Sequence, residues 1–142
     1  MFLLDTDHLV ILQRQSEPDY GRLRAAMSRY PASEFFLSIV SFHEQVLGAN
    51  AFITRARTRE AVIRGYQMLE LCLIDFNRFR VLPFDEPIAA TFDALRPRVQ
   101  IGAMDLRIAT TALSNSLTVL TRNTVDFEKV PNLRVEDWLS GD

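Results

Sequence analysis

The sequence contains few of the side chains that stabilise small secreted proteins or supply common nucleophile–base pairs. Its single cysteine, Cys72, excludes a disulfide framework, and the apolar stretch around it predicts a buried thiol in a reducing compartment. Its two histidines, His8 and His43, belong to no recognisable Ser-His-Asp or Cys-His arrangement. No segment is long and apolar enough to span a membrane, and the N-terminus lacks the regions of a signal peptide. We therefore expect a soluble, cytoplasmic protein without a membrane partner.

The chain also lacks a strong excess of charge of either sign. Its formal net charge of −2 argues against a polycation that binds nucleic acid with its whole surface. Of the 16 basic residues all except Lys129 are arginine, which pairs well with phosphate, although a genome's base composition also produces such a bias. Apolar residues make up 48% of the chain, which excludes disorder and predicts one domain, residues 1–142, with its own hydrophobic core.

Short apolar runs alternate with helical segments along the chain, without an internal repeat. Strands are expected at residues 2–4, 35–39, 80–83 and 117–120, with a short fifth at 133–135. Helices are expected at about 6–14, 18–30, 41–56, 58–76, 85–97 and 104–114. Strands that alternate with helices predict an α/β fold, a mainly parallel sheet of four or five strands covered on both faces.

Four isolated acids stand beside apolar segments of this pattern. Asp5 follows the first strand, Glu44 lies in the helix after the second, and Asp126 lies in the loop after the fourth. Asp105 begins a helix that leads into the fourth strand, so tertiary packing must bring it to the others. Reactive groups of such sheets collect outside the carboxyl ends of the strands. Because carboxylates beside a core are costly unless neutralised, the four acids predict a site for a divalent metal.

Asp5 and Glu44 each have a structural alternative at the start of a helix. Asp5 is a suitable N-cap for the helix that follows it, and Asp7 suits the first turn of that helix without any catalytic duty. Ser41 and Glu44 have the spacing of a capping box. Glu44 nevertheless shares a helix face with small and apolar residues (Leu47, Gly48 and Ala51), which favours a ligand that points toward the sheet edge.

Asp105 is the acid that is hardest to explain without a cation. At helical spacing it lines up with Ile108, Ala109 and Ala112, so it belongs to the expected buried stripe, while Thr110, Thr111 and Ser114 are expected on the opposite side. An unpaired carboxylate there would have a raised pKa or cost several kcal/mol. Asp126 lies among polar loop residues, where the alternative is that Asn123 and Asp126 only organise turns.

The residue types suit Mg²⁺ or Mn²⁺, which prefer carboxylate and water oxygens. Such an ion lowers the pKa of a bound water and aligns a scissile phosphate, so that no protein nucleophile is needed. We therefore expect Asp5, Glu44, Asp105 and Asp126 to be catalytic and to ligate the metal. Three neighbouring side chains are expected to support them by hydrogen bonds: Thr6, Thr121 and Asn123.

Four motifs together resemble the PIN-domain ribonucleases, and among them the VapC toxins. They are Leu3-Leu4-Asp5-Thr6-Asp7, Ser41-x-x-Glu44-x-x-Leu47-Gly48, Asp105-x-x-Ile108-Ala109-x-x-Ala112 and Leu120-Thr121-x-Asn123-x-x-Asp126-Phe127. The resemblance implies a three-layer α/β/α sandwich, acids that bind Mg²⁺ or Mn²⁺, and endonucleolytic cleavage of RNA. It also implies a homodimer and inhibition by a cognate antitoxin. Many members of this family carry a further acid where this chain has Asn123, which puts a second metal position and the role of Asp126 in doubt.

Arginines gather near the junction of the two long central helices: Arg55, Arg57, Arg59 and Arg64. They are interpreted either as a patch that tracks RNA phosphates or as an ordinary solvated helix face. Four aromatic residues are expected in the core or in dimer contacts: Phe76, Phe79, Tyr66 and Trp138.

Two other functions compete with the nuclease. Asp5-x-Asp7 after a strand resembles the acid pair of haloacid-dehalogenase-like phosphatases, with Asp5 as nucleophile. That family also has a lysine before its late acidic pair, whereas the only lysine here, Lys129, follows Asp126. The third hypothesis is a catalytically silent module that binds an antitoxin, but all four acids of the nuclease pattern are present.

Overall fold

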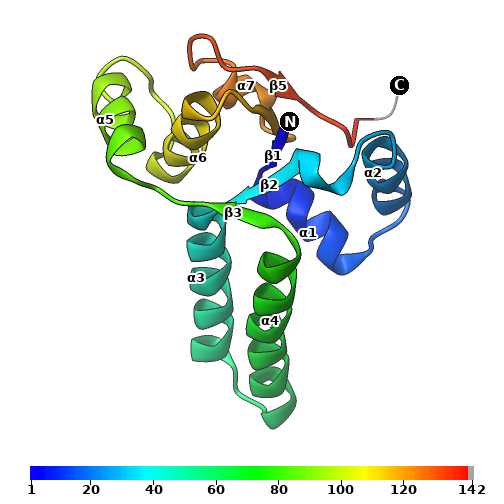
Figure 1. Cartoon of the computed structure of the whole chain (residues 1–142). Coiled ribbons are helices and arrows are strands. Elements are labelled where there is room, and N and C mark those ends of the chain that lie inside the picture. Colours follow the sequence, from blue (N-terminus) through cyan, green and yellow to red (C-terminus); the bar gives the residue numbers. More distant parts are fainter. Residues whose placement is uncertain (141–142) are drawn as a thin grey trace.

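The computed structural model describes residues 1–140 and places all five strands in one parallel sheet (Figure 1). The strands are β1 (Phe2–Leu4), β2 (Phe35–Ser38), β3 (Arg80–Leu82), β4 (Thr118–Leu120) and β5 (Val135–Glu136). Their order is β3-β2-β1-β4-β5, so the chain leaves the central strand β1 in one direction and returns on its other side at β4. The predicted α/β fold with a parallel sheet is confirmed, with five strands.

Helices cover both faces of this sheet. They are α1 (Thr6–Arg14), α2 (Asp19–Met27), α3 (Ile39–Arg55), α4 (Arg59–Arg78), α5 (Glu86–Leu95), α6 (Ala103–Ser114) and α7 (Thr124–Phe127), with a 3₁₀ turn, η1 (Ala32–Glu34), before β2. Residues of α5, α6 and α7 pack in the core on one face. Residues of α1 and α4 pack in the core on the other, which gives the expected three layers.

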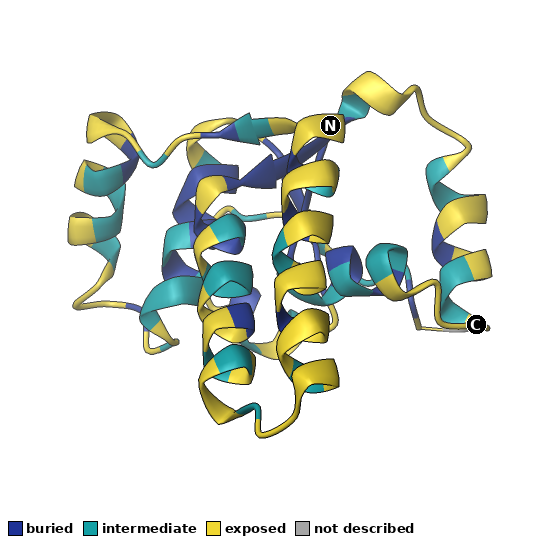
Figure 2. Ribbon diagram, turned by 90° about the horizontal axis from the view of Figure 1, so that it is seen from below, coloured by how far each residue is buried: buried dark blue, intermediate teal, exposed yellow. Residues whose placement is uncertain are grey.

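Alternation along the short strands divides the core between these two faces. Leu3 is in register with Phe36 and Val119, and all three contribute to the core beneath α6. Phe2 and Leu4 point the other way, into the core that contains Cys72 of α4. Because successive residues of a strand point to opposite faces and both faces of this sheet are covered, every residue of β1 lies in the core. Cys72 is buried, as predicted, and the three central strands β1, β2 and β4 are buried along their whole length (dark blue in Figure 2).

Several boundaries differ from those expected. Helix α3 begins at Ile39 rather than residue 41, because the Ser38 hydroxyl accepts a hydrogen bond from the Val40 N–H and caps the helix there. Helix α2 ends at Met27, and Tyr30 lies outside it. Strand β5 begins two residues later and ends one residue later than the expected 133–135. The loop expected around Asp126 contains the short helix α7.

Helices α3 and α4 form an antiparallel hairpin that projects from the sheet (Figure 1). Gly65 allows their close approach, because a Cβ at this position would lie 2.3 Å from Cγ1 of Ile53. Of the aromatic residues expected in the core or in dimer contacts, Phe76 is buried and Phe79 and Trp138 pack at the margin of the core, whereas Tyr66 is 55% exposed on α4. Within residues 1–140, no helix is long and apolar enough to cross a membrane.

Candidate active site at the carboxyl edge of the sheet

Asp5 lies directly after β1, at the edge where the central strands end. Its side chain caps α1 by accepting a hydrogen bond from the Thr6 N–H at 2.8 Å, so the N-cap interpretation is confirmed. The same carboxylate accepts a second hydrogen bond, from the Thr121 hydroxyl at 2.8 Å. Burial, and then the nearby Asp7, raises the pKa of Asp5 from 3.8 to about 7, against the opposing effect of these donors. Capping and a place in the site are therefore compatible roles.

Thr121 is the hydrogen-bonding centre of the site. It follows β4, the neighbour of β1, and is fully buried. Its hydroxyl lies 2.8 Å from Asp5 Oδ2 and 3.2 Å from Asp7 Oδ2, and it accepts the N–H of Asn123 at 3.0 Å. The side chain predicted as a support thus joins the acids after β1 to the loop after β4.

Glu44 reaches this edge from the second turn of α3. Its Oε1 accepts a hydrogen bond from the Thr6 hydroxyl at 3.0 Å. The capping-box alternative is wrong, because α3 is already capped by Ser38 and Ser41 lies inside the helix with a buried hydroxyl. Burial, together with the charge of Asp105, raises the pKa of Glu44. The structure therefore brings Glu44 beside the residue that follows Asp5.

The amide side chain of Asn123 lies between Asp105 and Asp126. Asn123 Nδ2 lies 3.1 Å from Asp126 Oδ2 and 3.5 Å from Asp105 Oδ2. Burial, followed by the charges of Asp126 and Asp7, raises the pKa of Asp105. The hydrogen bond from Asn123, and then that from Lys129, lowers the pKa of Asp126. Asp105 and Asp126 thus stand in contrasting electrostatic environments although a single residue touches both.

The surroundings of Asp105 are more enclosed than the sequence pattern predicted. Ile108, Ala109 and Ala112 are fully buried, as expected. Thr110 and Thr111, expected on the opposite side, are fully buried as well, and each donates its hydroxyl hydrogen bond to the Arg107 carbonyl. Packing of α6 between the sheet and α5 explains the difference, because it covers both sides of the helix. Asp105 itself is half-buried at the open end of α6.

His8 is a member of this network that sequence reasoning missed. It is fully buried, and its Nε2 accepts the Trp138 N–H at 3.2 Å. Nδ1 therefore carries the proton and donates to Asp7 Oδ1 at 2.8 Å. Asp7 also accepts the Arg122 N–H at 2.9 Å, and these donors, against the effect of burial, lower its pKa. The adjacency of Asp7 and His8 was the available signal, but only the fold reveals the partner in the C-terminal segment.

The electrostatics of Asp5, Glu44 and Asp105 fit a bound cation. All three have raised pKa values, and Asp105 contributes to the rise at both of the others. Within residues 1–140, no lysine, arginine or histidine forms an ion pair with any of them. In the same residues, no three aspartate, glutamate, histidine or cysteine side chains lie close enough together to hold a metal ion. Mutual repulsion between carboxylates opposes such a gathering, and a divalent cation offsets that repulsion.

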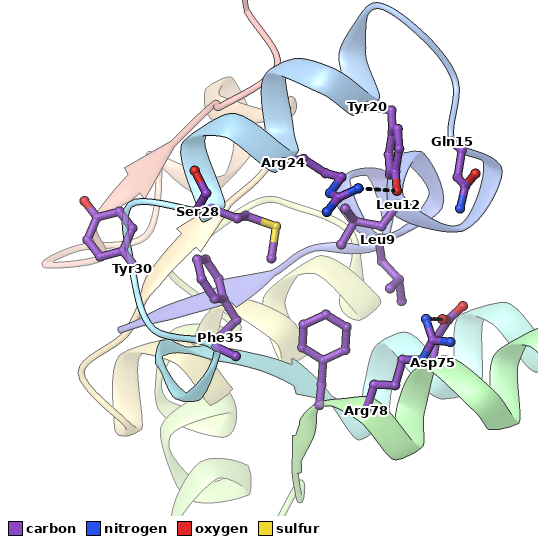
Figure 3. A pocket seen from close by; sticks show the side chains of 13 residues that line it. Leu9, Leu12, Gln15, Tyr20, Arg24, Ser28, Tyr30, Phe35, Asp75 and Arg78 are labelled. Atoms are coloured by element: carbon purple, nitrogen blue, oxygen red, sulfur yellow. Dashed lines mark hydrogen bonds and ion pairs between the residues drawn. The ribbon is translucent and has the colours of Figure 1, made fainter.

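A separate cavity of about 580 Å³ lies between α1, α2 and the end of α4 (Figure 3). The apolar part of its lining comes from Leu9, Leu12, Met27, Phe35 and Phe79. Arg24 and Tyr20 form a hydrogen bond on one wall, and Arg78 faces Asp75 at 3.9 Å on another. With Asp75 as its single carboxylate, this cavity lacks the set of acids that metal-assisted chemistry requires. The sheet edge is therefore the better candidate for an active site.

The arginines singled out in the sequence lie away from the acids, at the tip of the hairpin. Arg55 ends α3, Arg57 lies in the connection, and Arg59 begins α4. Arg55, Arg57 and Arg64 line a hollow of about 790 Å³ together with Phe52. Their proposed contact with RNA stays a prediction.

The fold and motifs agree with comparisons to known proteins. A profile of the PIN domain matches residues 2–133. The chain belongs to the PIN-domain family. The PIN protein "Ribonuclease VapC" of Rickettsia bellii is 37% identical over 139 residues, which cover 94% of this chain and 92% of that protein. "Toxin FitB" of Neisseria gonorrhoeae is 32% identical over 132 residues, covering 89% and 91%.

A solved structure supports the same assignment. The crystal structure of FitAcB from Neisseria gonorrhoeae contains a chain that superposes with a TM-score of 0.74 at 29% identity, covering 97% of this chain and 98% of the other. The PIN family resemblance inferred from the four motifs is thereby confirmed, over nearly the whole chain.

Proposed function

We propose that this PIN protein is a metal-dependent endoribonuclease and the toxin of a type II toxin–antitoxin pair. The observation that carries the proposal is the convergence of Asp5, Glu44 and Asp105 at one sheet edge, where burial raises the pKa of each and no basic side chain of residues 1–140 pairs with them. The names of the VapC and FitB relatives support ribonuclease activity and a toxin role. Membership of the PIN family favours this function over the phosphatase alternative.

In this proposal Asp5, Glu44 and Asp105 hold Mg²⁺ or Mn²⁺. When bound there, such an ion would lower the pKa of a water and offset charge on the leaving oxygen. Thr121 orients Asp5, and Thr6 orients Glu44, through the hydrogen bonds described above. Asn123 sets the separation of Asp105 from Asp126. Asp126, which already has Lys129 as a counter-charge, is proposed as the fourth acid of the site with a supporting role.

Cleavage of defined RNAs by the purified protein tests the proposal. We expect cutting of one or more of a transfer RNA, a ribosomal RNA fragment and a message in Mg²⁺ or Mn²⁺, and none in excess EDTA. Asp5→Asn and Asp105→Asn should abolish it, while Asp93→Asn, at an exposed position of α5, should not. Equal cutting by the wild type in EDTA would refute the metal mechanism. A trapped aspartyl-phosphate with small esters would instead favour the phosphatase.

The partners proposed are a cognate antitoxin and a second copy of the chain. Expression in a bacterial host should arrest growth, and co-expression of the protein encoded by a short neighbouring gene should restore it. The purified chain should sediment at twice its mass of 16.3 kDa. Growth arrest by the Asp105→Asn variant would support the third hypothesis, a silent module that acts by binding alone.

A further inference from the structure

One face of α3 connects the acids to the arginines at the hairpin tip. Glu44, Gly48, Ala51 and Arg55 follow one another at intervals of four, three and four residues, so they lie on the same side of the helix. Eleven residues at 1.5 Å each place Arg55 about 16 Å along the axis from Glu44. The hollow at the tip therefore begins on the same helix face that presents Glu44 to the candidate active site.

The hollow is open, and its lining is mainly apolar, from small residues, Phe52 and Met68, with three arginine side chains among the lining residues. We name it the arginine groove and define it by Gly48, Ala51, Phe52, Arg55, Arg57 and Arg64. A Cβ built at Gly48 would meet no atom within 4 Å, so this wall is free space rather than a packed contact. The groove has a volume of about 790 Å³, and the hairpin that carries it projects from the sheet (Figures 1 and 2).

The arginines of the groove form no ion pair with a carboxylate of residues 1–140. Within residues 1–140, Arg55, Arg57 and Arg64 take part in no ion pair, although Arg22, Arg78 and Arg122 do. The Arg64 guanidinium lies 5.8 Å from the centre of the Phe52 ring, which holds this cation at the groove. Phe52 is 36% exposed and offers part of its ring to solvent. Unpaired guanidinium groups beside an exposed aromatic ring suit a strand of phosphates and bases.

An anionic substrate needs such a subsite here, because the acids at the sheet edge repel phosphate. We propose that the arginine groove is a second RNA-binding subsite that holds phosphates of the strand a few nucleotides from the scissile bond, with Phe52 as a stacking surface for a base. This inference rests on the proposed ribonuclease function and adds where the rest of the substrate lies. It predicts that affinity depends on RNA length, because a short RNA cannot span α3 from Glu44 to Arg55.

RNA binding in EDTA tests the arginine groove separately from cleavage. The triple variant R55Q/R57Q/R64Q is compared with R14Q/R29Q/R98Q, which removes the same number of charges from exposed positions elsewhere. By fluorescence anisotropy with a labelled single strand of about 16 nucleotides, we expect the groove variant to bind at least tenfold more weakly. The slope of log affinity against log salt should fall by about two, as expected for three lost phosphate contacts on a single strand. The control should behave as wild type.

Two further variants separate charge from structure. R55K/R57K/R64K keeps the charges and should recover most of the affinity, whereas Phe52→Leu should weaken binding a few-fold without changing the salt slope. In cleavage assays the glutamine variant should lose kcat/KM on the long RNA but not on one of about four nucleotides. Binding equal to that of the control, or a changed assembly state in sedimentation with unchanged RNA affinity, would overturn the subsite. Groove-dependent binding without any cleavage would instead refute only the proposed function.

Discussion

Asp5 and Asp126 are the same residue type at the same sheet edge, yet their environments are opposite. Asp5 is 6% exposed, accepts hydrogen bonds from neutral donors, and has a pKa raised to about 7. Asp126 is 37% exposed at its side chain, lies 3.2 Å from the Lys129 ammonium, and has a lowered pKa. Asp126 is therefore satisfied by the protein itself. Asp5 has no basic partner among residues 1–140. We therefore expect Asp5 to depend on a bound metal ion more strongly than Asp126 does.

The largest expected effect is on catalysis. Asp5→Ala removes a proposed ligand and should lower kcat by well over ~100-fold, more than is usual for residues that only orient ligands. Asp126→Ala should cost about 10–100-fold, the range typical of such supporting residues. Single-turnover cleavage at saturating Mg²⁺ measures both. Equal losses of kcat in the two variants would show that the different environments of Asp5 and Asp126 do not give them different catalytic weight.

The next effect is a pH dependence of stability that only Asp5 should show strongly. The folded-state pKa of about 7 exceeds the unfolded value of 3.8, so folding favours the protonated acid. The stability from this preference is complete below about pH 4 and is lost as the pH rises through 7. Without metal, Asp5→Asn should thus equal wild type in acid and exceed it by up to about 4 kcal/mol above pH 7. Urea unfolding at several pH values in EDTA measures the difference.

Mg²⁺ provides the control for that experiment. An ion that binds only the folded protein raises its stability by mass action. Wild type should therefore gain stability at pH 7 on addition of Mg²⁺, and Asp5→Asn should gain little. A pH profile that is identical for the two proteins in EDTA would show that burial does not impose the expected penalty on Asp5.

A smaller effect is expected at His8, which supports the Asp7 side of the site. His8→Ala leaves the Trp138 N–H and one oxygen of Asp7 without partners, at a cost of about 1–3 kcal/mol for a buried polar group. His43→Ala is the matched control, because His43 is exposed and should change stability by less than about 0.5 kcal/mol. Thermal unfolding of the two variants compares them. Equal stability would mean that water replaces His8 without loss.

The fold was predictable because its strands and helices differ clearly in period and hydrophobicity. Phe2–Leu4 and Thr118–Leu120 are short apolar runs that only a sheet covered on both faces accommodates. The start of α3 was not predictable, since Ser38 and Ser41 are equally good caps in the sequence and only the end of β2 selects Ser38. Burial of Thr110 and Thr111 likewise depends on how α5 and α6 pack, which no local pattern encodes.

The four acids and the weaker place of Asp126 among them could be inferred from the sequence, but the contacts that position them could not. The sequence offers a capping box as the alternative role of Glu44, whereas the structure gives Glu44 a long-range hydrogen bond to Thr6 and a raised pKa. Several contacts that organise the site join residues more than one hundred positions apart, such as the hydrogen bond from Thr121 to Asp5. His8 was missed for the same reason, because its second partner is Trp138. Parallel topology creates these contacts, and residue spacing does not reveal them.

The smallest predicted effect concerns the counter-charge of Asp126. Lys129→Gln removes the ammonium but leaves Asn123, the donor that lowers the pKa of Asp126 most. The pKa of Asp126 should therefore rise only part of the way to its ordinary value, and the pKa of Asp5 should not move. Carboxyl NMR titration of the metal-free protein resolves both groups. If instead the pKa of Asp126 stayed at its wild-type value while the pKa of Asp105 changed, the ammonium of Lys129 would act on Asp105. Lys129 would then not be the counter-charge that distinguishes Asp126 from Asp5.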